Sequence, residues 1–162
     1  MANVATSNAL GGTQVAVSTT YKTQVNVYSS STTSARRGKV YDVLVGTNGT
    51  PADNYMEWDI SRFSATAILT GTAVTPNPLD PADAAFLGVS VANATTENTY
   101  VNNGTGASVF YVGVNQRASY RWVAAPGSEL VYAATNMVGL GLRTRSGGYT
   151  GTATGQLYVQ ES

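Results

Sequence analysis

The sequence predicts an all-β protein, a jelly-roll-like antiparallel β-sandwich of roughly eight to ten short strands with at most one short helical turn near residues 80–85. The last third of the chain, residues 118–160, consists of short apolar-alternating runs separated by turn residues. Residues 55–60 alternate between apolar and polar side chains, as in a strand with one buried face. No stretch shows a sustained helical period, which favours an all-β fold.

Strong turn signals separate the C-terminal strands. The sharpest is Pro126 followed by Gly127, because proline presets the φ of the first turn position and glycine accepts the positive φ that follows. A second, glycine-rich turn contains Gly147 and Gly148. The strands predicted around these turns cover residues 118–125, 129–134, 137–143 and 152–160.

The middle of the chain supplies the partner strands. Within residues 55–60, Met56, Trp58 and Ile60 share one face, and we expect Trp58 to anchor the core. Further strands are predicted at residues 40–45, 65–70, 72–74, 86–91 and 107–114.

Residues 80–85 contain the one helix-start signal. Asp80 can cap a helix, Pro81 suits the first helical position, and Asp83 falls in the first turn. The following residues return to strand character, so we expect a single helical turn inside a long loop.

The N-terminal residues are rich in Ser, Thr, Asn and Gly, and their apolar residues alternate only over short stretches at 14–17 and 24–28. We interpret residues 1–36 as an extended N-terminal arm with short strands, and residues 37–162 as the β-sandwich domain. An ordinary edge strand with a frayed terminus is the alternative interpretation.

Charged residues make up 11% of the chain, with 9 basic and 9 acidic side chains, whereas globular proteins average about a quarter. This balance provides no general attraction to nucleic acid or to an anionic membrane, and we expect neither as a partner. The chain has no cysteine and no histidine, which excludes disulfides, thiolate metal sites and Ser–His–Asp catalysis. We therefore expect no enzymatic activity and no cofactor.

Two groups of charged residues could have a function. Arg36, Arg37 and Lys39 form the only basic cluster and are the candidate contact with an acidic partner surface, although a solvated strand end that discourages edge pairing explains them as well. Glu57 and Asp59 lie two residues apart on one strand face, so their carboxylates could approach the separation of about 5–5.5 Å that a retaining glycosidase requires. Acidic residues on the polar face of a strand are the simpler interpretation.

Loop aspartates and aromatic residues are further candidates. Asp53, Asp80 and Asp83 could bind a hard cation such as calcium, but no calcium-loop spacing is present, which favours turn and capping roles. The large aromatic residues could form a sugar-stacking platform or belong to half-buried strands and interfaces. They are Tyr55, Tyr100, Tyr111, Tyr120, Trp122, Tyr132, Tyr149 and Tyr158.

The C-terminal residues show a recognisable order of motifs: P-G-S-E at 126–129, M-V-G-L-G-L-R at 137–143, a glycine-rich turn, and G-Q-L-Y-V-Q at 155–160. In pattern, residues 111–160 resemble the closing strands of small jelly-roll proteins on tailed-bacteriophage virions. The resemblance implies a capsid decoration (cement) protein. Such proteins are commonly homotrimers that sit at local three-fold positions of the shell and bind the major capsid protein through an N-terminal segment.

The resulting hypothesis is a virion structural protein, made in the host cytoplasm, that binds the outer surface of a phage capsid and stabilises it by adhesion. A carbohydrate- or receptor-binding β-sandwich of a phage fibre or spike is one alternative. The jelly-roll shell protein of a small icosahedral virus is another, but such proteins often carry a strongly basic arm, and only Lys22 precedes Arg36 here.

Overall fold

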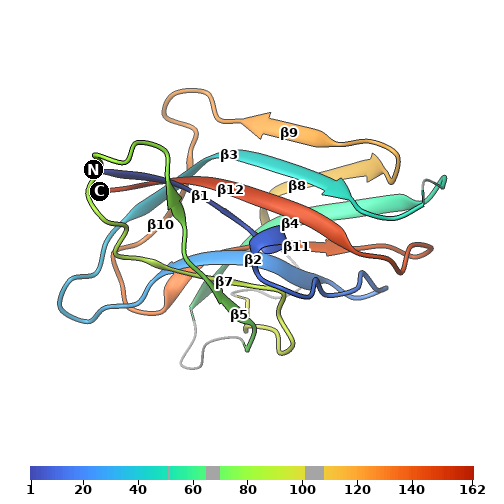
Figure 1. The fold of residues 1–162 in the computed structure, drawn as a ribbon, viewed down its shortest axis with the longest axis horizontal. Helices are drawn as coiled ribbons and strands as arrows, with labels where there is room; N and C mark the ends of the chain where they lie inside the picture. The colour runs from blue at the N-terminus through green and yellow to red at the C-terminus, as the bar shows by residue number, and fades with distance from the viewer. Residues whose placement is uncertain (51, 65–69, 101–107) are drawn as a thin grey trace.

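The structure, a computed structural model, describes residues 1–50, 52–64, 70–100 and 108–162. These residues form twelve β-strands and one short 3-10 helix, η1 (Asn8–Leu10). The strands make two antiparallel sheets that pack as a sandwich (Figure 1). The predicted all-β sandwich is therefore confirmed.

Eight strands pair in a nested order, the first with the last and so on inward. The pairs are β1 (Ala2–Ser7) with β12 (Ala153–Glu161), β2 (Lys22–Ser29) with β11 (Val138–Arg145), β3 (Gly38–Thr47) with β9 (Tyr120–Val123), and β4 (Tyr55–Ser64) with β8 (Ser108–Asn115). This is one long hairpin folded over on itself, which is the arrangement of a jelly roll. The two ends of the chain consequently lie side by side (Figure 1).

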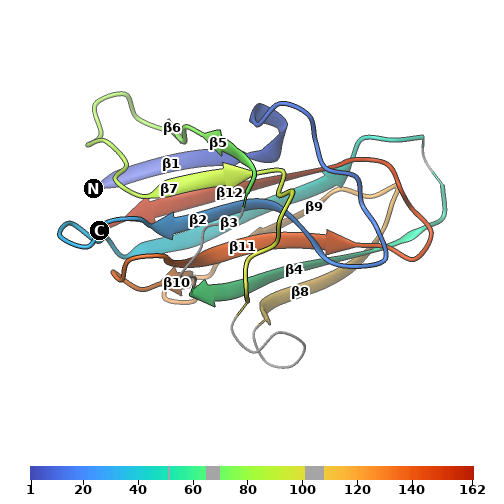
Figure 2. The same cartoon turned by 90° about the horizontal axis from the view of Figure 1, so that it is seen from below.

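Four short strands extend the two sheets (Figure 2). The sheet that contains β1, here called the β1 sheet, has the order β10-β3-β12-β1-β6, and β9 shares the β3 edge with β10. The sheet that contains β2, the β2 sheet, has the order β5-β7-β2-β11-β4-β8. The short strands are β5 (Thr72–Val74), β6 (Asn77–Pro78), β7 (Val89–Ala92) and β10 (Leu130–Tyr132).

Alternate side chains of both sheets fill the space between them. Met56, Trp58 and Ile60 are fully buried on one face of β4, as the alternation predicted, and Trp58 is a core residue. From the β1 sheet they are covered by a cluster that includes Val4, Val40, Val43, Val45, Leu157 and Val159.

The turn predicted at Pro126 and Gly127 is also present and connects β9 to β10. Gly127 has a φ of 84°, and the Ser128 N–H donates to the Ala125 carbonyl at 2.9 Å. Glycine is favoured here because a side chain is strained at such a φ.

The short strands predicted within residues 1–36 are present, but both belong to the sandwich and not to a separate extended arm. β1 lies between β12 and β6, and β2 lies between β11 and β7 in the interior of its sheet. Both strands obtain partners from the far end of the chain. The polar composition of this region gave no sign of those partners, because backbone hydrogen bonding does not depend on side-chain polarity.

The helix-start signal at Asp80 produces a turn and not a helix. The Asp80 carbonyl accepts a hydrogen bond from the Asp83 N–H at 3.0 Å, and its carboxylate accepts one from the Ala82 N–H at 2.8 Å. The strand expected at residues 65–70 falls largely outside the described residues, whereas its continuation at 72–74 is β5.

Substitutions on β1 test whether it is part of the sandwich. Val4 is 1% exposed and faces the core, whereas Ala5 is half-buried on the outer side. We expect Val4→Asn to lower the free energy of unfolding by roughly 3 kcal/mol, because it buries an amide among apolar side chains. Ala5→Asn should cost less than about 1 kcal/mol. Urea denaturation of both variants measures the difference, and equal small effects would show that β1 is detached.

Candidate functional site

The two sheets present different outer faces. The outer face of the β1 sheet is largely open. Asp42 on this face is buried in an ion pair with the exposed Arg121. The other side chains on it are half-buried or exposed: Asn3, Ala5, Lys39, Tyr41, Leu44, Val123, Gln156, Tyr158 and Gln160. The outer face of the β2 sheet is covered over part of its area, where the buried Tyr28, Asp59, Ser61, Phe63 and Arg143 lie. The cover comes from the segment after β7, in which Ala94 and Tyr100 pack against this face.

Glycines on β11 allow aromatic side chains to approach the backbone of this strand closely. A Cβ on Gly141 would lie 2.3 Å from the Tyr100 hydroxyl oxygen, and one on Gly139 would lie 2.4 Å from the Tyr28 Cβ. The aromatic rings therefore lie directly against the strand. Phe63 meets both Tyr28 and Tyr100 edge-on, with ring centroids 5.9 Å apart in each pair, a favourable aromatic geometry.

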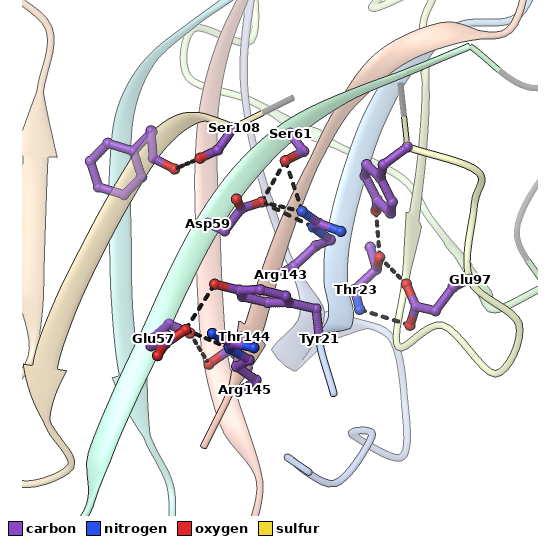
Figure 3. Close-up of polar contacts among 12 residues, drawn as sticks. Tyr21, Thr23, Glu57, Asp59, Ser61, Glu97, Ser108, Arg143, Thr144 and Arg145 are labelled. Atoms are coloured by element: carbon purple, nitrogen blue, oxygen red, sulfur yellow. Dashed lines mark hydrogen bonds and ion pairs between the residues drawn. The ribbon is translucent and has the colours of Figure 1, made fainter. Parts of the chain in front are cut away.

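An ion pair between Asp59 and Arg143 lies at the centre of the covered face (Figure 3). The Asp59 Oδ1 accepts hydrogen bonds from Arg143 Nε at 3.0 Å and Nη2 at 2.8 Å, and from the Ser61 hydroxyl at 2.7 Å. Arg143 Nη2 also donates to Ser61 at 2.8 Å. The two side chains are only 5% and 8% exposed, so this pair is shielded from solvent.

A second ion pair, Glu57 with Arg145, lies next to the first and closer to solvent. The Tyr21 hydroxyl donates to Glu57 Oε2 at 3.0 Å, which joins the loop before β2 to β4 (Figure 3). Burial raises the pKa of Tyr21 above its ordinary value, and the hydrogen bond to Glu57 acts in the same direction. Tyr21 therefore remains a donor to the carboxylate at neutral pH.

A third set of contacts fixes the covering segment. Glu97 accepts hydrogen bonds from the Thr23 N–H at 2.9 Å and from the Thr23 hydroxyl. The Tyr100 hydroxyl is hydrogen-bonded to the same Thr23 hydroxyl. Burial raises the pKa of Tyr100, so this side chain stays neutral in the folded protein.

The guanidinium groups stack on tyrosine rings. The Arg143 Cζ lies 4.1 Å from the ring centroid of Tyr100 and 4.8 Å from that of Tyr21, and the Arg145 Cζ lies 4.7 Å from the Tyr21 centroid. These are cation–π distances. A hollow of ≈ 320 Å³ borders the stack. It is lined by Thr19, Thr20, Tyr21, Glu97, Asn98, Tyr100, Arg143 and Arg145.

The two carboxylates considered for glycoside hydrolysis, Glu57 and Asp59, thus both form ion pairs with arginines. Glu57 and Asp59 lie on one face of β4, as predicted, but each is bound by an arginine of β11. The sequence contains a signal for this arrangement: Arg143 and Arg145 are also two residues apart, so they share one face of their strand. The geometry favours a structural role for the two carboxylates.

Aromatic side chains divide into buried and exposed groups. Tyr100, Tyr132 and Tyr149 are buried, and Tyr120, Trp122 and Tyr158 are half-buried. Tyr55 and Tyr111 are exposed on adjacent strands of the β2 sheet, and their hydroxyl oxygens are 3.0 Å apart. These two are therefore available to a ligand or partner.

The predicted basic contact residues lie at the start of β3. Arg36 and Arg37 are exposed in the loop before the strand, and Lys39 is half-buried on the outer face of the β1 sheet. In the described part of the chain none of the three has an acidic partner within 4.0 Å. Their contact with a partner stays a prediction.

The loop aspartates make the turn and surface contacts that we favoured. Asp83 Oδ2 accepts hydrogen bonds from the backbone and side-chain nitrogens of Asn3 at 3.1 and 3.2 Å. Asp53 forms an exposed ion pair with Arg117 at 3.0 Å. Among the described residues no group of three acidic side chains is close enough to hold a metal ion.

Comparison of the chain with protein-family models, curated proteins and solved structures finds no match. No helix in the described ranges is long and apolar enough to cross a membrane.

The buried ion pair should be far more important for stability than the exposed one. We expect Asp59→Asn to lower the free energy of unfolding by roughly 3–5 kcal/mol, because it leaves the buried Arg143 without a counter-charge. The matched control, Asp53→Asn, breaks a surface pair and should cost less than about 1 kcal/mol. Urea denaturation of both variants measures the difference, and equal effects would contradict the central role of Asp59.

Alkaline pH should destabilise the fold through Tyr100. Its pKa is raised in the folded protein, whereas tyrosine in an unfolded chain has a pKa of about 10. The contribution of Tyr100 is therefore complete below that pH and is lost as the pH rises above it. We expect the melting temperature to fall between about pH 9 and 11, and to fall less steeply in Tyr100→Phe. An unchanged slope in the variant would show that Tyr100 does not contribute.

Proposed function

We propose that this chain is a structural protein of a virion, which binds the outer surface of a bacteriophage capsid and stabilises it by adhesion and not by catalysis. The proposed partner is the major capsid protein, and the proposed form is a homotrimer on the capsid surface. Neither nucleic acid nor a membrane is a proposed partner.

The open outer face of the β1 sheet is the observation that supports adhesion most strongly. Leu44 and Val123 are 38% and 58% exposed there, next to Arg121 and Asp42, whose charges are paired with each other. Shallow hollows on either side, of ≈ 230 and ≈ 380 Å³, are bordered by Leu44 and by Lys39 with Tyr41 respectively. A broad, weakly charged face with exposed apolar residues is suited to contact with another protein surface.

The basic residues can add an electrostatic contact at one edge of this face. Lys39 lies on the face itself, and Arg36 and Arg37 immediately precede it in sequence. We propose that these three side chains lie opposite acidic groups of the shell. Because β1 and β2, the two strands within the first 36 residues, are paired inside the sheets, the folded body and not a free arm would make the contact.

The edge of the sandwich formed by β8 and β9 supports self-association. Phe110 packs against Trp122 and Tyr120 with ring centroids 5.5 and 6.3 Å apart. All three rings are only partly buried, although they point toward the core. A second copy would complete their burial, and symmetry would then multiply a weak single capsid contact by avidity.

A negative charge on the open outer face of the β1 sheet should weaken capsid binding. We expect Val123→Asp to reduce the affinity by roughly tenfold or more, because its carboxylate would lose water in the contact. The measurement is co-sedimentation with capsids of the virus that encodes this chain, stripped of accessory proteins.

The matched control is Ala73→Asp, which places the same charge at an exposed position of the other sheet, on β5 and away from the β8–β9 edge, and should bind normally. Light scattering should give a mass three times the 16.8 kDa of the chain. Unchanged capsid binding by Val123→Asp would exclude this face, and a monomeric mass would exclude the trimer.

A further inference from the structure

We propose that the outer face of the β2 sheet carries a binding site for a neutral saccharide, formed by Tyr55, Tyr111, Arg145 and the hollow beside Arg145. This site lies on the opposite side of the sandwich from the proposed capsid-binding face. It is independent of the proposed capsid role.

The two tyrosines form an exposed aromatic platform. Tyr55 is 54% and Tyr111 is 53% exposed, and their hydroxyl groups are hydrogen-bonded at 3.0 Å. A Cβ on Gly113 would lie 2.6 Å from the Tyr55 Cε2, so the ring lies directly against the backbone of β8. Rings held in this way lose little conformational freedom when a ligand binds. Their faces can pack against the apolar C–H surface of a sugar ring, as aromatic side chains pack on other apolar groups.

Arg145 supplies hydrogen-bond donors next to this platform. Its Nε donates to Glu57, and its guanidinium stacks 4.7 Å from the Tyr21 ring centroid, which together fix its orientation. The side chain is nevertheless 44% exposed. Within the described residues its terminal nitrogens have no hydrogen-bond partner in the protein. A fixed and exposed guanidinium can donate two or more hydrogen bonds to hydroxyl groups of a ligand.

The hollow has the size and lining of a small-ligand site. Its ≈ 320 Å³ volume lies at the lower end of the range of about 300–1,000 Å³ for ligand pockets. Arg145 and Tyr21 line it on the side of the second ion pair, and Glu97 and Tyr100 line it on the side of the covering segment. Hydroxyl groups both donate and accept, so they match a lining that contains guanidinium, carboxylate and phenol groups.

Charge favours a neutral ligand. The cluster contains two guanidinium groups, Arg143 and Arg145, and the carboxylates of Glu57, Asp59 and Glu97. The carboxylates therefore outnumber the cations, and the site offers no net attraction to sulfate, phosphate or a sugar acid. The tyrosine faces nearest the hollow are already occupied by the two arginines, which leaves no aromatic cage for a cationic ligand.

A glycan array followed by titration tests the site. Labelled protein is applied to neutral oligosaccharides of glucose, galactose, mannose and N-acetylglucosamine, beside sialylated and uronate-containing ones. The strongest neutral binder is then titrated against the wild type and the variants. We expect Tyr111→Ser and Arg145→Gln each to raise the Kd at least about tenfold, since each removes one of the two kinds of contact.

Matched controls are Val123→Ser, an exposed apolar residue on the other sheet, and Arg62→Gln, an exposed arginine on β4. Both should bind the oligosaccharide as the wild type does, and thermal denaturation should show every variant folded. The proposal is overturned if the wild type binds no array member or only anionic ones, if binding survives either site substitution, or if a control variant loses it equally. Co-sedimentation with capsids should be unaffected by Tyr111→Ser.

Discussion

The pairing of the first strand with the last is the constraint on which the rest of this structure depends. β1 and β12 pair from Ala2 opposite Glu161 to Ser7 opposite Gln156. Asn8 then continues the contact: its side chain accepts from the Gly155 N–H and donates to the Ala153 carbonyl, each at 2.8 Å. The remaining long strands pair inside this first pair, β2 with β11, β3 with β9 and β4 with β8, which is the jelly-roll order.

The same topology makes the two outer faces unequal. The chain between β4 and β8 adds β5 and β7 to the β2 sheet and then returns across its outer face as far as Tyr100. Its described residues contribute just the two-residue β6 to the β1 sheet, whose outer face stays largely open. One side of the sandwich is therefore a broad surface suited to adhesion, and the other carries a compact polar cluster with an exposed rim.

The polar cluster illustrates how two ordinary strand patterns become specific when they pair. Glu57 and Asp59 alternate on β4, and Arg143 and Arg145 alternate on β11. The register places Asp59 opposite Arg143 and Glu57 opposite Arg145. Opposite charges directly across a strand pair stabilise that register over a slipped one, which would place every side chain of the strand on the wrong face. The cover by Tyr100 then removes the inner pair from water.

The sequence by itself determined the fold class, the alternation that buries Trp58, and the turn at Gly127, because these depend on neighbouring residues along the chain. The incorporation of residues 1–36 into both sheets, the pairing of the two acidic with the two basic residues, and the exposure of Tyr55 and Tyr111 were decided only by the tertiary structure. Each of them depends on segments more than fifty residues apart, and a local pattern contains no information about which distant strand supplies its hydrogen bonds.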